Sequence, residues 1–393
     1  MIPLNEARQI ISGKVARKGP ATVALGEARG GVLSDAVRAD ADYPAVDRST
    51  MDGYALRADE TSGDLSVVGE IRAGSVWEKP IAPGEALRVF TGAALPPAAG
   101  RVVPQEQVRR TGDRIEIVQP EPSHFIRRKG GEARAGEVIL AAGTRLGAAE
   151  LSVLAQLGVV TPQVIAAPMI THLVTGDEIV PPSASPGPGQ IRDSNSALIA
   201  ALASDFGLEI AQAGHAPDDL AAIVSFLHEP ADLILLSGGA SVGDYDLGAR
   251  ALEQAGFAVH FRQVNLRPGK PLTFATRGDT AAFVLPGNPV AHFVCWHVAV
   301  KLALERFLGL APRWEFLDLE VFDGQLPRPD PRQVFWPAKV VIRDGRPGVI
   351  PKPWSTSGNT FVLPDTNALV RIDGTRANEG TIPTLLVGKY DLF

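Results

Sequence analysis

Short apolar runs alternate with helix-like segments between about residue 169 and residue 310. The runs are bounded by Gly, Pro or Asp, a pattern typical of strands buried on both faces of a sheet. They are Met169–Val174, Ala231–Leu236, Phe257–Val264 and Ala281–Leu285. The helix-like segments are Ser194–Phe206, Asp218–His228 and Val290–Leu308. This alternation predicts a parallel α/β domain, in which ligands bind beyond the carboxyl ends of the strands.

The residues that follow these strands are rich in groups that bind phosphates and metal ions. Glycines allow backbone N–H groups to approach a phosphate closely, carboxylates suit Mg²⁺, and Arg or Lys suits an oxyanion. The segments are TGDE at 175–178, SGGASVGDYD at 237–246, LRPGKP at 266–271 and LPGNP at 285–289. Asp193 precedes the first helix and is expected to cap it, to bind a metal ion, or to do both. The rim of the sheet therefore predicts a combined phosphate and metal site.

Two further regions show the short, Gly- and Pro-broken segments of β domains. One covers residues 65–120. The other runs from Trp314 to Phe393, where alternating segments predict a small β-barrel or sandwich. Helices are expected over Leu4–Val15 and Ala148–Leu157. The chain is therefore expected to be an α/β multidomain protein.

The composition excludes several classes of protein. The 393 residues suffice for two to four domains, and the net charge of −6 argues against a general nucleic-acid binder. Cys295 is the one cysteine, which excludes an intramolecular disulfide and a Cys-rich zinc site, and its apolar neighbours predict a buried thiol. No signal peptide and no apolar run long enough to span a membrane are visible. We expect a cytoplasmic protein that binds neither nucleic acid nor membrane.

Three features outside the α/β domain allow both a structural and a functional interpretation. Asp52 and Gly53 form either a turn that opens a strand or a carboxylate displayed towards a partner site. Thr91 ends a predicted strand, where its hydroxyl belongs to a plain turn or meets an anion. The basic cluster at 127–129 is either a solvated face or a phosphate site.

The segment from Gly239 to Gly243 matches the G-x-S-x-G pattern of serine hydrolases, with Ser241 as the nucleophile. In such enzymes the serine lies on a sharp turn directly after a strand and before a helix. Here Ser237, Gly238 and Gly239 intervene, and Asp, Tyr and Asp follow where a helix should begin. The sequence therefore favours a ligand-binding loop, with a hydrolase as an alternative.

Nine motifs, taken in order, resemble the MoeA family of molybdopterin molybdenumtransferases, which includes the E domain of gephyrin. They are DRSTMDGYA at 47–55, VFTGAALP at 89–96, VVPQEQ at 102–107, IRRKGGEARAG at 126–136, TGDE at 175–178, GQIRDSN at 189–195, SGGASVGDYD at 237–246, RPGKP at 267–271 and LPGNPV at 285–290. They span most of the chain. No single motif is decisive, but nine in the family's order are highly specific.

The resemblance implies a homodimer of elongated, four-domain subunits. The expected domains are an N-terminal linker or helical domain at 1–45 and 140–165, a small β domain at 46–139, a molybdopterin-binding α/β domain similar to MoaB and Mog at 166–312, and a C-terminal β-barrel at 313–393. The active cleft would lie between the α/β domain of one subunit and the small β domain of the other. That arrangement would give Asp52 a functional role.

The activity implied by the resemblance is Mg²⁺-dependent insertion of molybdenum from molybdate into adenylylated molybdopterin, with release of AMP. The implied metal ligands are Asp177, Glu178, Asp193, Asp244 and Asp246. The implied catalytic residues are Asp52, Asp177, Glu178, Asp193 and Asp244. The implied cofactor-binding residues are Thr91, Ser237, Gly238, Gly239, Ser241, Gly243, Asp246, Arg267, Lys270, Pro286, Gly287, Asn288, Arg332 and Ser357. A molybdopterin adenylyltransferase and maturation proteins of molybdenum enzymes are the expected partners.

Departures from the family pattern lead to a second hypothesis. Glu132 stands where the family has an aspartate, and Ala291 stands where it usually has a serine. Arg267 replaces one of two lysines and offers a planar fork in place of a point charge. Pro337 replaces an arginine of the C-terminal domain. These changes lie mainly around the expected molybdate end, so the alternative is a molybdopterin carrier or scaffold with weak or no transferase activity.

Overall fold

The computed structural model describes residues 1–60, 63–119, 123–240, 247–324, 326, 330–373 and 380–388. The chain forms two compact units. The first comprises residues 1–34, 145–151 and 161–393, and the second comprises residues 35–144 and 152–160. Both units are therefore built from separate stretches of the chain. The finer division into four domains stays a prediction.

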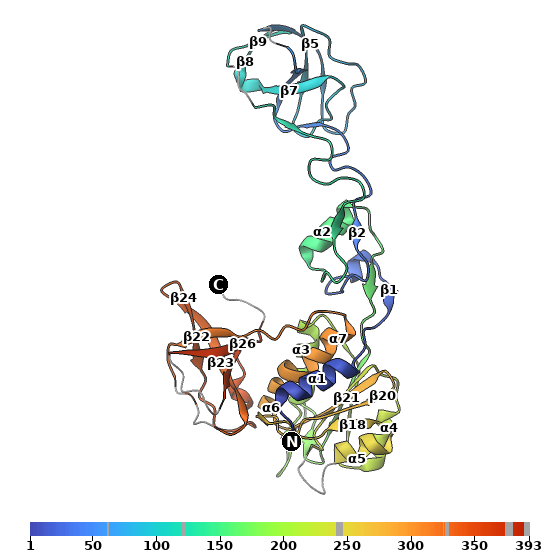
Figure 1. Ribbon diagram of the computed structural model, residues 1–393, viewed down its shortest axis with the longest axis vertical. Helices are drawn as coiled ribbons and strands as arrows, with labels where there is room; N and C mark the ends of the chain where they lie inside the picture. Colours follow the sequence, from blue (N-terminus) through green and yellow to red (C-terminus); the bar gives the residue numbers. More distant parts are fainter. Residues whose placement is uncertain are drawn as a thin grey trace. The chain divides into compact units, whose positions relative to one another are not determined.

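The centre of the first unit is a six-stranded sheet with the order β16-β13-β17-β21-β20-β18. Figure 1 labels β21, β20 and β18 of this sheet. Its strands are β13 (Ile170–Thr175), β16 (Ile210–Ala216), β17 (Leu233–Ser237), β18 (Ala258–Phe261), β20 (Thr273–Arg277) and β21 (Thr280–Leu285). β13, β16, β17 and β21 are mutually parallel, whereas β20 is antiparallel to both β18 and β21. Of the six strands described in this sheet, β20 alone opposes the rest, so the carboxyl ends of the other five meet at one rim.

The predicted strands are present, with two differences. β13, β17 and β21 are buried almost throughout, as expected of runs that lack charged residues. β18 lies at the edge and is exposed at its first residue, so the prediction that Phe257–Val264 is buried on both faces is wrong. The sheet is mixed and not wholly parallel, because a tight hairpin between Arg277 and Thr280 returns the chain from β20 to β21.

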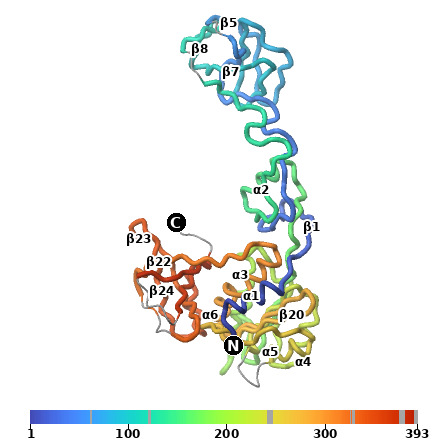
Figure 2. The backbone as a smooth tube through the Cα atoms, viewed as in Figure 1, coloured from blue at the N-terminus to red at the C-terminus, as the bar shows by residue number. Residues whose placement is uncertain are grey.

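Helices cover both faces of this sheet (Figures 1 and 2). α4 (Leu220–Leu227) and α5 (Leu247–Gln254) pack on one face. The other face carries α1 (Leu4–Lys14), α3 (Asn195–Asp205), α6 (Pro289–Cys295) and α7 (Lys301–Phe307). A π-helical turn, Trp296–Val300, joins α6 to α7. Cys295 is buried in this layer as predicted, and burial raises the pKa of its thiol.

The C-terminal region forms a closed five-stranded barrel, which confirms the barrel alternative over the sandwich. Its strands are β22 (Leu317–Val321), β23 (Gln333–Arg343), β24 (Arg346–Pro351), β25 (Ala368–Ile372) and β26 (Thr381–Leu386). The strand order is β23-β24-β22-β26-β25, and pairing of β25 with β23 closes the ring. β19 (Leu266–Arg267), which leaves the α/β domain, pairs in parallel with β23. The barrel is thereby joined to the rim of the central sheet.

The second unit contains another six-stranded sheet, with the order β7-β4-β6-β5-β9-β8. Its strands are β4 (Gly53–Arg57), β5 (Asp64–Ile71), β6 (Glu85–Val89), β7 (Ala99–Pro104), β8 (Val108–Thr111) and β9 (Arg114–Ile117). Short antiparallel pairs flank it, namely β2 (Val37–Arg38) with β11 (Val138–Leu140) and β3 (Arg48–Ser49) with β10 (Ile126–Arg127). This architecture is the small β domain that the segments at 65–120 predict.

A few short elements remain. They are β1 (Pro20–Thr22) paired with β12 (Gln163–Ile165), β14 (Ile179–Val180) paired with β15 (Ile191–Arg192), and α2 (Ala148–Gln156).

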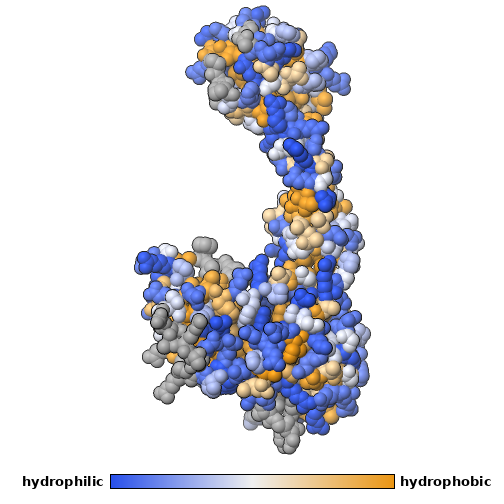
Figure 3. All heavy atoms as spheres, viewed as in Figure 1, coloured by the Kyte–Doolittle hydropathy of each residue, from blue (hydrophilic) through white to orange (hydrophobic). Residues whose placement is uncertain are grey.

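In the view of Figure 3, hydrophilic side chains predominate on the first unit, with apolar residues in small groups between them. No helix in the described ranges is both long and apolar enough to cross a membrane.

Candidate functional site

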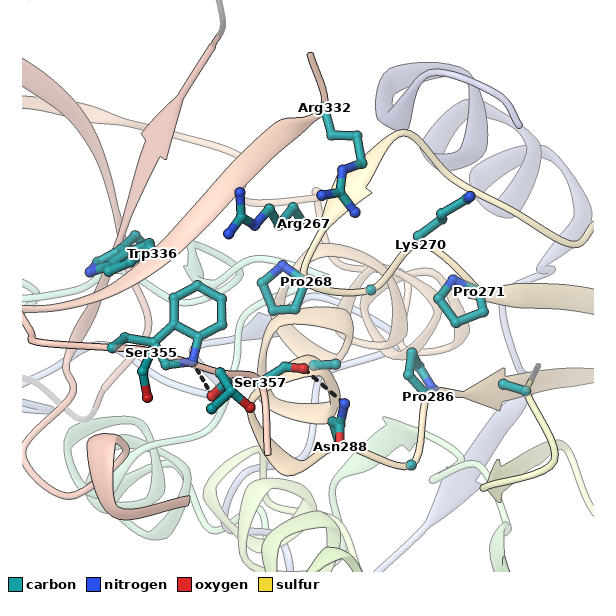
Figure 4. A pocket seen from close by; sticks show the side chains of 16 residues that line it. Arg267, Pro268, Lys270, Pro271, Pro286, Asn288, Arg332, Trp336, Ser355 and Ser357 are labelled. Carbon is teal, nitrogen blue, oxygen red and sulfur yellow. Dashed lines mark hydrogen bonds between the residues drawn. The ribbon is translucent and has the colours of Figure 1, made fainter. Parts of the chain in front are cut away.

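A cleft of about 480 Å³ lies between the rim of the α/β sheet and the barrel, within the first unit (Figure 4). One side comes from the segments after β18 and β21, and the other comes from the start of β23 and the loop after β24. The structure brings together here these residues singled out from the sequence: Arg267, Lys270, Pro286, Gly287, Asn288, Arg332 and Ser357. Their individual roles stay predictions.

Pairing with the barrel positions the first cationic side chain of the cleft. β19 lies alongside β23, so that Arg267 is opposite Val334. The chain then turns at Gly269, where φ is +117° and a Cβ would lie 2.8 Å from Sγ of Cys295. Glycine is required at such a turn because side chains rarely adopt this φ and no space is left for one. The turn brings Lys270 into the same cleft (Figure 4).

A carboxylate that sequence reasoning missed, Asp330, joins two of the cationic side chains. Arg332 forms a fork on it, with Nε 2.9 Å from Oδ1 and Nη2 2.9 Å from Oδ2. Arg267 donates from Nη1 to the same Oδ2 at 2.7 Å. Chiefly because of the Arg332 side chain, the pKa of Asp330 lies far below its usual range, and the pKa of Arg332 is raised in turn. Lys270 lines the same cleft, so its cationic side chains outnumber this one carboxylate, and the net positive charge suits an oxyanion.

The barrel side of the cleft offers aromatic rings and hydroxyl groups. Trp336 and Trp354 pack edge to face, with ring centroids 4.6 Å apart and an interplanar angle of 68°. Both indole N–H groups donate to backbone carbonyls, so the apolar ring surfaces are what these residues offer a ligand. Nδ2 of Asn288 donates to Oγ of Ser357 at 2.8 Å (Figure 4). This bond ties the loop after β24 to the start of α6.

Carboxylates gather near the carboxyl end of β13. Oδ1 of Asp177 accepts from the backbone N–H of Asp218 at 3.2 Å. Burial, and then repulsion from Glu178 and Asp177, raises the pKa of Asp218. Asp193 accepts at Oδ1 from the backbone N–H of Ser196 at 3.0 Å, which confirms the predicted helix cap. Metal binding by Asp193 stays a prediction.

Mg²⁺ binding by the carboxylates at this rim stays a prediction. Within the described ranges, no group of three or more His, Cys, Asp or Glu side chains is arranged to hold a metal ion. Mg²⁺ is, however, usually bound through one or two carboxylates, together with water and substrate phosphates. Asp177 and Glu178 supply hard oxygen donors of this kind. The remaining predicted residues of the loop lie outside the described residues, and they are Ser241, Gly243, Asp244 and Asp246.

Ser237 is buried beneath the rim, with its side chain 1% exposed. Its Oγ lies 2.6 Å from Nε2 of His172 and 2.7 Å from Nε2 of His292, so one imidazole accepts the hydroxyl proton and the other donates to the oxygen. Burial lowers the pKa of His172 to about 4 and that of His292 to about 3. The Ser237 side chain therefore has a structural role, and a cofactor-binding role of residue 237 stays a prediction.

The two glycines that follow Ser237 adopt positive φ angles of 95° for Gly238 and 63° for Gly239. A Cβ on Gly238 would lie 2.4 Å from the carbonyl oxygen of Thr175, at the end of the neighbouring β13. Only glycine fits this close approach. The start of the loop thus has the glycine-dependent geometry expected of a segment that presents backbone N–H groups to a phosphate.

In the second unit, strand pairing brings the two predicted functional residues together. β4 begins directly after Asp52, and it pairs with β6, which ends two residues before Thr91. The backbone N–H and the hydroxyl of Thr91 donate to Oδ1 of Asp52 at 2.7 and 2.8 Å. These bonds lower the pKa of Asp52, the backbone N–H being the largest cause. Asp52 is therefore a fixed, ionised carboxylate, whose hydroxyl partner is Thr91.

The basic cluster at 127–129 is matched by acidic side chains. The pairs are Arg127 with Glu132 at 3.2 Å, Arg128 with Asp47 at 2.7 Å, and Lys129 with Asp42 at 3.6 Å. More than half of each cationic side chain is exposed. The pairing favours the interpretation of a solvated face over that of a phosphate site.

Sequence reasoning also missed the other lining residues of the barrel. Trp336 and Trp354 are 18 positions apart in the chain and meet only because β23 and β24 pair in the closed barrel. Asp330 lies in a segment of Pro, Arg and Asp that has no periodic pattern. The one usable signal is the run WSTS at 354–357, where a Trp and three hydroxyl residues stand together between strands.

The fold and the cleft define a class of protein in which an α/β domain and a β-barrel enclose a cationic cleft, a place suited to a phosphorylated or oxyanionic ligand. Residues 2–158 match the family model described as the MoeA N-terminal region (domain I and II). Residues 171–306 match the family model described as a probable molybdopterin binding domain.

Comparison with known proteins gives the particular family. The molybdopterin molybdenumtransferase of Nostoc sp. is 36% identical over 88% of this chain and 83% of that protein. The enzyme of the same name from Staphylococcus aureus is 30% identical over 95% of this chain and 92% of that protein. The solved MoeA protein of Pyrococcus horikoshii has a TM-score of 0.81 and 26% identity, covering 99% of this chain and 100% of that chain. The chain belongs to the molybdopterin molybdenumtransferase family.

Proposed function

We propose that this protein inserts molybdenum from molybdate into adenylylated molybdopterin and releases AMP, as a step of molybdenum cofactor biosynthesis. The observation that carries the proposal is the cationic cleft formed by Arg267, Lys270 and Arg332. Molybdate is a tetrahedral oxyanion whose oxygens accept hydrogen bonds from guanidinium and ammonium groups. Membership of the family supports the choice of molybdate and molybdopterin over other oxyanions and cofactors.

The organic part of the substrate has suitable surfaces close to this cationic end. The rings of Trp336 and Trp354 line the same cleft and suit the apolar faces of a pterin or an adenine. The loop that begins at Gly238 would hold the phosphate through backbone N–H groups. A substrate bound in this way would lie beside the cationic end of the cleft, and fixing the two reactants together is itself a large part of catalysis.

Mg²⁺ belongs to the proposal as a bound cofactor. It would be held by Asp177 and Glu178, together with the predicted ligands Asp193, Asp244 and Asp246. When bound, it would polarise the pyrophosphate bond of the adenylylated substrate. Carboxylate oxygens are the ligands that a hard divalent cation such as Mg²⁺ prefers.

We extend the proposal to a homodimer, in which Asp52 of one subunit serves the α/β rim of the other. The low pKa of Asp52 and its fixed position against Thr91 support a role for an ionised carboxylate. A side chain whose only task was to close a turn would not need two charge-assisted bonds at a partly exposed position.

A second function, that of a molybdopterin carrier, is favoured by one observation. Ala291 lines the cleft in the first turn of α6, at the place where the family usually offers a serine hydroxyl. Loss of that donor weakens the hold on an oxyanion without affecting the phosphate loop. A carrier would therefore bind the pterin without inserting molybdenum and without releasing AMP.

Single-turnover release of AMP from adenylylated molybdopterin, with Mg²⁺ and with or without molybdate, tests the two functions. We expect release that depends on molybdate, with the metal recovered on the pterin. Tight binding of the pterin without release would establish the carrier. Absence of pterin binding would contradict both functions.

A further inference from the structure

Asp330 occupies an unusual position for an acidic residue, because it lies beside a cleft that we propose binds an anion. Its side chain is 10% exposed. It accepts four hydrogen bonds, three of them from Arg332 (Nε, Nη2 and the backbone N–H) and one from Nη1 of Arg267. A carboxylate has about four lone-pair sites, so Asp330 is fully occupied by these two residues.

The two arginines approach each other through this carboxylate. Nη1 of Arg267 and Nη2 of Arg332 both lie within 2.9 Å of the same oxygen, Oδ2 of Asp330. Figure 4 shows the two guanidinium groups close together above Pro268. Two like charges at this separation repel, and each side chain has several rotatable bonds. Without Asp330 between them, the arginines would separate and sample other rotamers.

Two physical effects of Asp330 on an incoming anion therefore have opposite signs. Its negative charge repels the anion and weakens binding. Its hydrogen bonds hold two forks of N–H donors in one orientation, which strengthens binding because less side-chain entropy is lost when the anion arrives. The bonds to Asp330 that the structure gives use two of the five N–H groups of the Arg332 guanidinium and one of the five of Arg267.

The identity of residue 267 indicates which effect is larger. A lysine at this place would bring a point charge whose donors rotate freely, and it would gain little orientation from Asp330. Arginine has a planar fork, so it can bind Asp330 with one N–H while it presents others to the cleft. The arginine at position 267 and the carboxylate at position 330 thus form a matched pair.

We propose that Asp330 is a positioning residue that holds Arg267 and Arg332 as a paired clamp for a tetrahedral oxyanion. This inference rests on the proposed function, since it takes molybdate as the anion. Arg267 stands where the family has a lysine. On this inference the replacement means that the molybdate site is built differently, and not that the site is lost. The transferase is thereby favoured over the carrier.

The test measures binding of sodium molybdate to the full-length protein by isothermal titration calorimetry. Asp330→Asn removes one negative charge from the cleft and keeps the size of the side chain. We expect it to weaken molybdate binding about tenfold, as loss of a charged hydrogen-bonding partner does, although the cleft becomes more positive. Asp323→Asn is the matched control. Asp323 pairs with Arg343 on the exposed surface of the same barrel, and its replacement by asparagine changes the net charge by the same amount.

The direction in which Asp330→Asn changes the affinity for molybdate shows which of the two effects is larger. Binding by Asp330→Asn that is as tight as that of the unaltered protein, or tighter, would overturn it, because Coulomb repulsion would then be the larger effect. If Asp330→Asn does not fold, Arg267→Lys decides. It keeps the charge and leaves the Arg332 fork intact, and weaker binding supports the clamp, whereas equal or tighter binding contradicts it.

A double variant separates positioning from a general structural role. In the Arg267→Lys background, Asp330→Asn should cost less binding than it does alone, because Asp330 no longer joins two arginines there and only its bonds to Arg332 remain to be lost. Equal losses in both backgrounds would overturn the clamp. An unaltered protein that binds no molybdate would instead contradict the proposed function, so the two failures are distinguishable.

Discussion

Single carboxylates in this protein differ in how much of their hydrogen-bonding capacity is already used. Asp330 accepts four bonds from two arginines and is committed to holding them. Asp52 accepts two bonds, both at Oδ1 and both from Thr91. These two bonds do not involve Oδ2 of Asp52, and the side chain is partly exposed. Asp330 is thus suited to position other groups, and Asp52 is suited to act on a substrate.

Asp52→Ala is expected to abolish turnover and leave folding intact. The physical reason is the loss of an ionised carboxylate from a partly exposed position that contributes no core packing. Because the pKa of Asp52 is lowered, the group stays ionised throughout pH 5 to 8, and its titration should not appear in the rate profile over that range. The rate of AMP release and the thermal unfolding midpoint are the measurements.

Thr91→Ser is the control for Asp52→Ala, since it keeps both the hydroxyl and the backbone N–H that hold the carboxylate. It should retain activity. An unchanged rate in Asp52→Ala would remove this residue from the site.

The buried histidines predict acid lability. Burial holds the pKa of His172 at about 4 and that of His292 at about 3, below the value of 6.5 for an unburied imidazole. The unfolded chain therefore binds more protons below pH 6.5, and the free energy of unfolding falls as the pH drops from 6.5 towards 4. Each histidine adds a slope of up to about 1.4 kcal/mol per pH unit. Well above pH 6.5 the imidazoles are unprotonated in both states, and the slope from these groups vanishes.

Urea unfolding followed by tryptophan fluorescence at pH 7.5, 6.5, 5.5 and 5 measures this slope. His172→Gln should flatten it by about one histidine's share, because Gln does not titrate and its amide can still donate to Ser237. The same slope in both proteins would show that His172 is not protonated on unfolding.

The sequence predicts site residues well where a motif sits at the end of a buried strand. The segments after β18 and β21 were placed at one rim because their strands are short and apolar, and the structure finds them lining one cleft. Asp330 and Trp354 could not be predicted in this way. Their neighbours in space come from distant parts of the chain, and only closure of the barrel and the pairing of β19 with β23 bring them to the cleft.

At the scale of secondary structure, the helix that leaves the cleft contains a π-helical turn, Trp296–Val300, which is anchored from outside. A π-helical turn breaks the regular hydrogen-bond ladder and frees backbone carbonyls for other donors. Nη1 of Arg8, on α1, donates to the carbonyl of Val298 at 2.6 Å, and its guanidinium lies 3.7 Å from the ring centroid of Trp314. Arg8 therefore links α1 to the π-helical turn and to Trp314, which precedes the first strand of the barrel.

Arg8→Met is expected to lower the free energy of unfolding by about 2–3 kcal/mol. The variant leaves the buried Val298 carbonyl without its charged donor and removes a cation near the buried Glu305. Arg8 is 8% exposed, and burial lowers its pKa to about 10. Chemical denaturation monitored by tryptophan fluorescence measures the loss.

Gln9→Met is the matched control for Arg8→Met, since it introduces the same side chain at the next, exposed position of α1. It should change the free energy of unfolding by less than about 0.5 kcal/mol. Equal effects of the two variants would contradict the anchoring role of Arg8.

Elements that the sequence predicts poorly are those with few apolar residues. β16 (IAQAGHA) lies at an edge and buries only its last residue, so its sequence lacks the apolar run of a central strand. β20 (TFATR) is short and ends in an arginine, and its antiparallel direction follows from the hairpin to β21. Tertiary pairing, and not local preference, makes these segments strands.

At the scale of the whole molecule, the predicted site residues are divided between two compact units. Arg332 and the strand-end carboxylates belong to the first unit, and Asp52 belongs to the second. If one subunit supplies Asp52 to the α/β rim of another, the complete site needs a homodimer. A two-fold symmetric dimer would then contain two such sites, each built from both chains.

Mixed dimers of Asp52→Ala and Arg332→Ala subunits test this shared site. Each variant alone should be inactive, because both of its sites lack one residue. In an equal mixture, half of the dimers contain one subunit of each kind, and one of their two sites combines an intact Asp52 with an intact Arg332. The mixture should therefore recover about a quarter of the original activity. If each site used residues of a single chain, every site in the mixture would lack one residue, and no activity would return. Co-expression with two affinity tags would isolate the mixed dimers, whose activity should rise to about half.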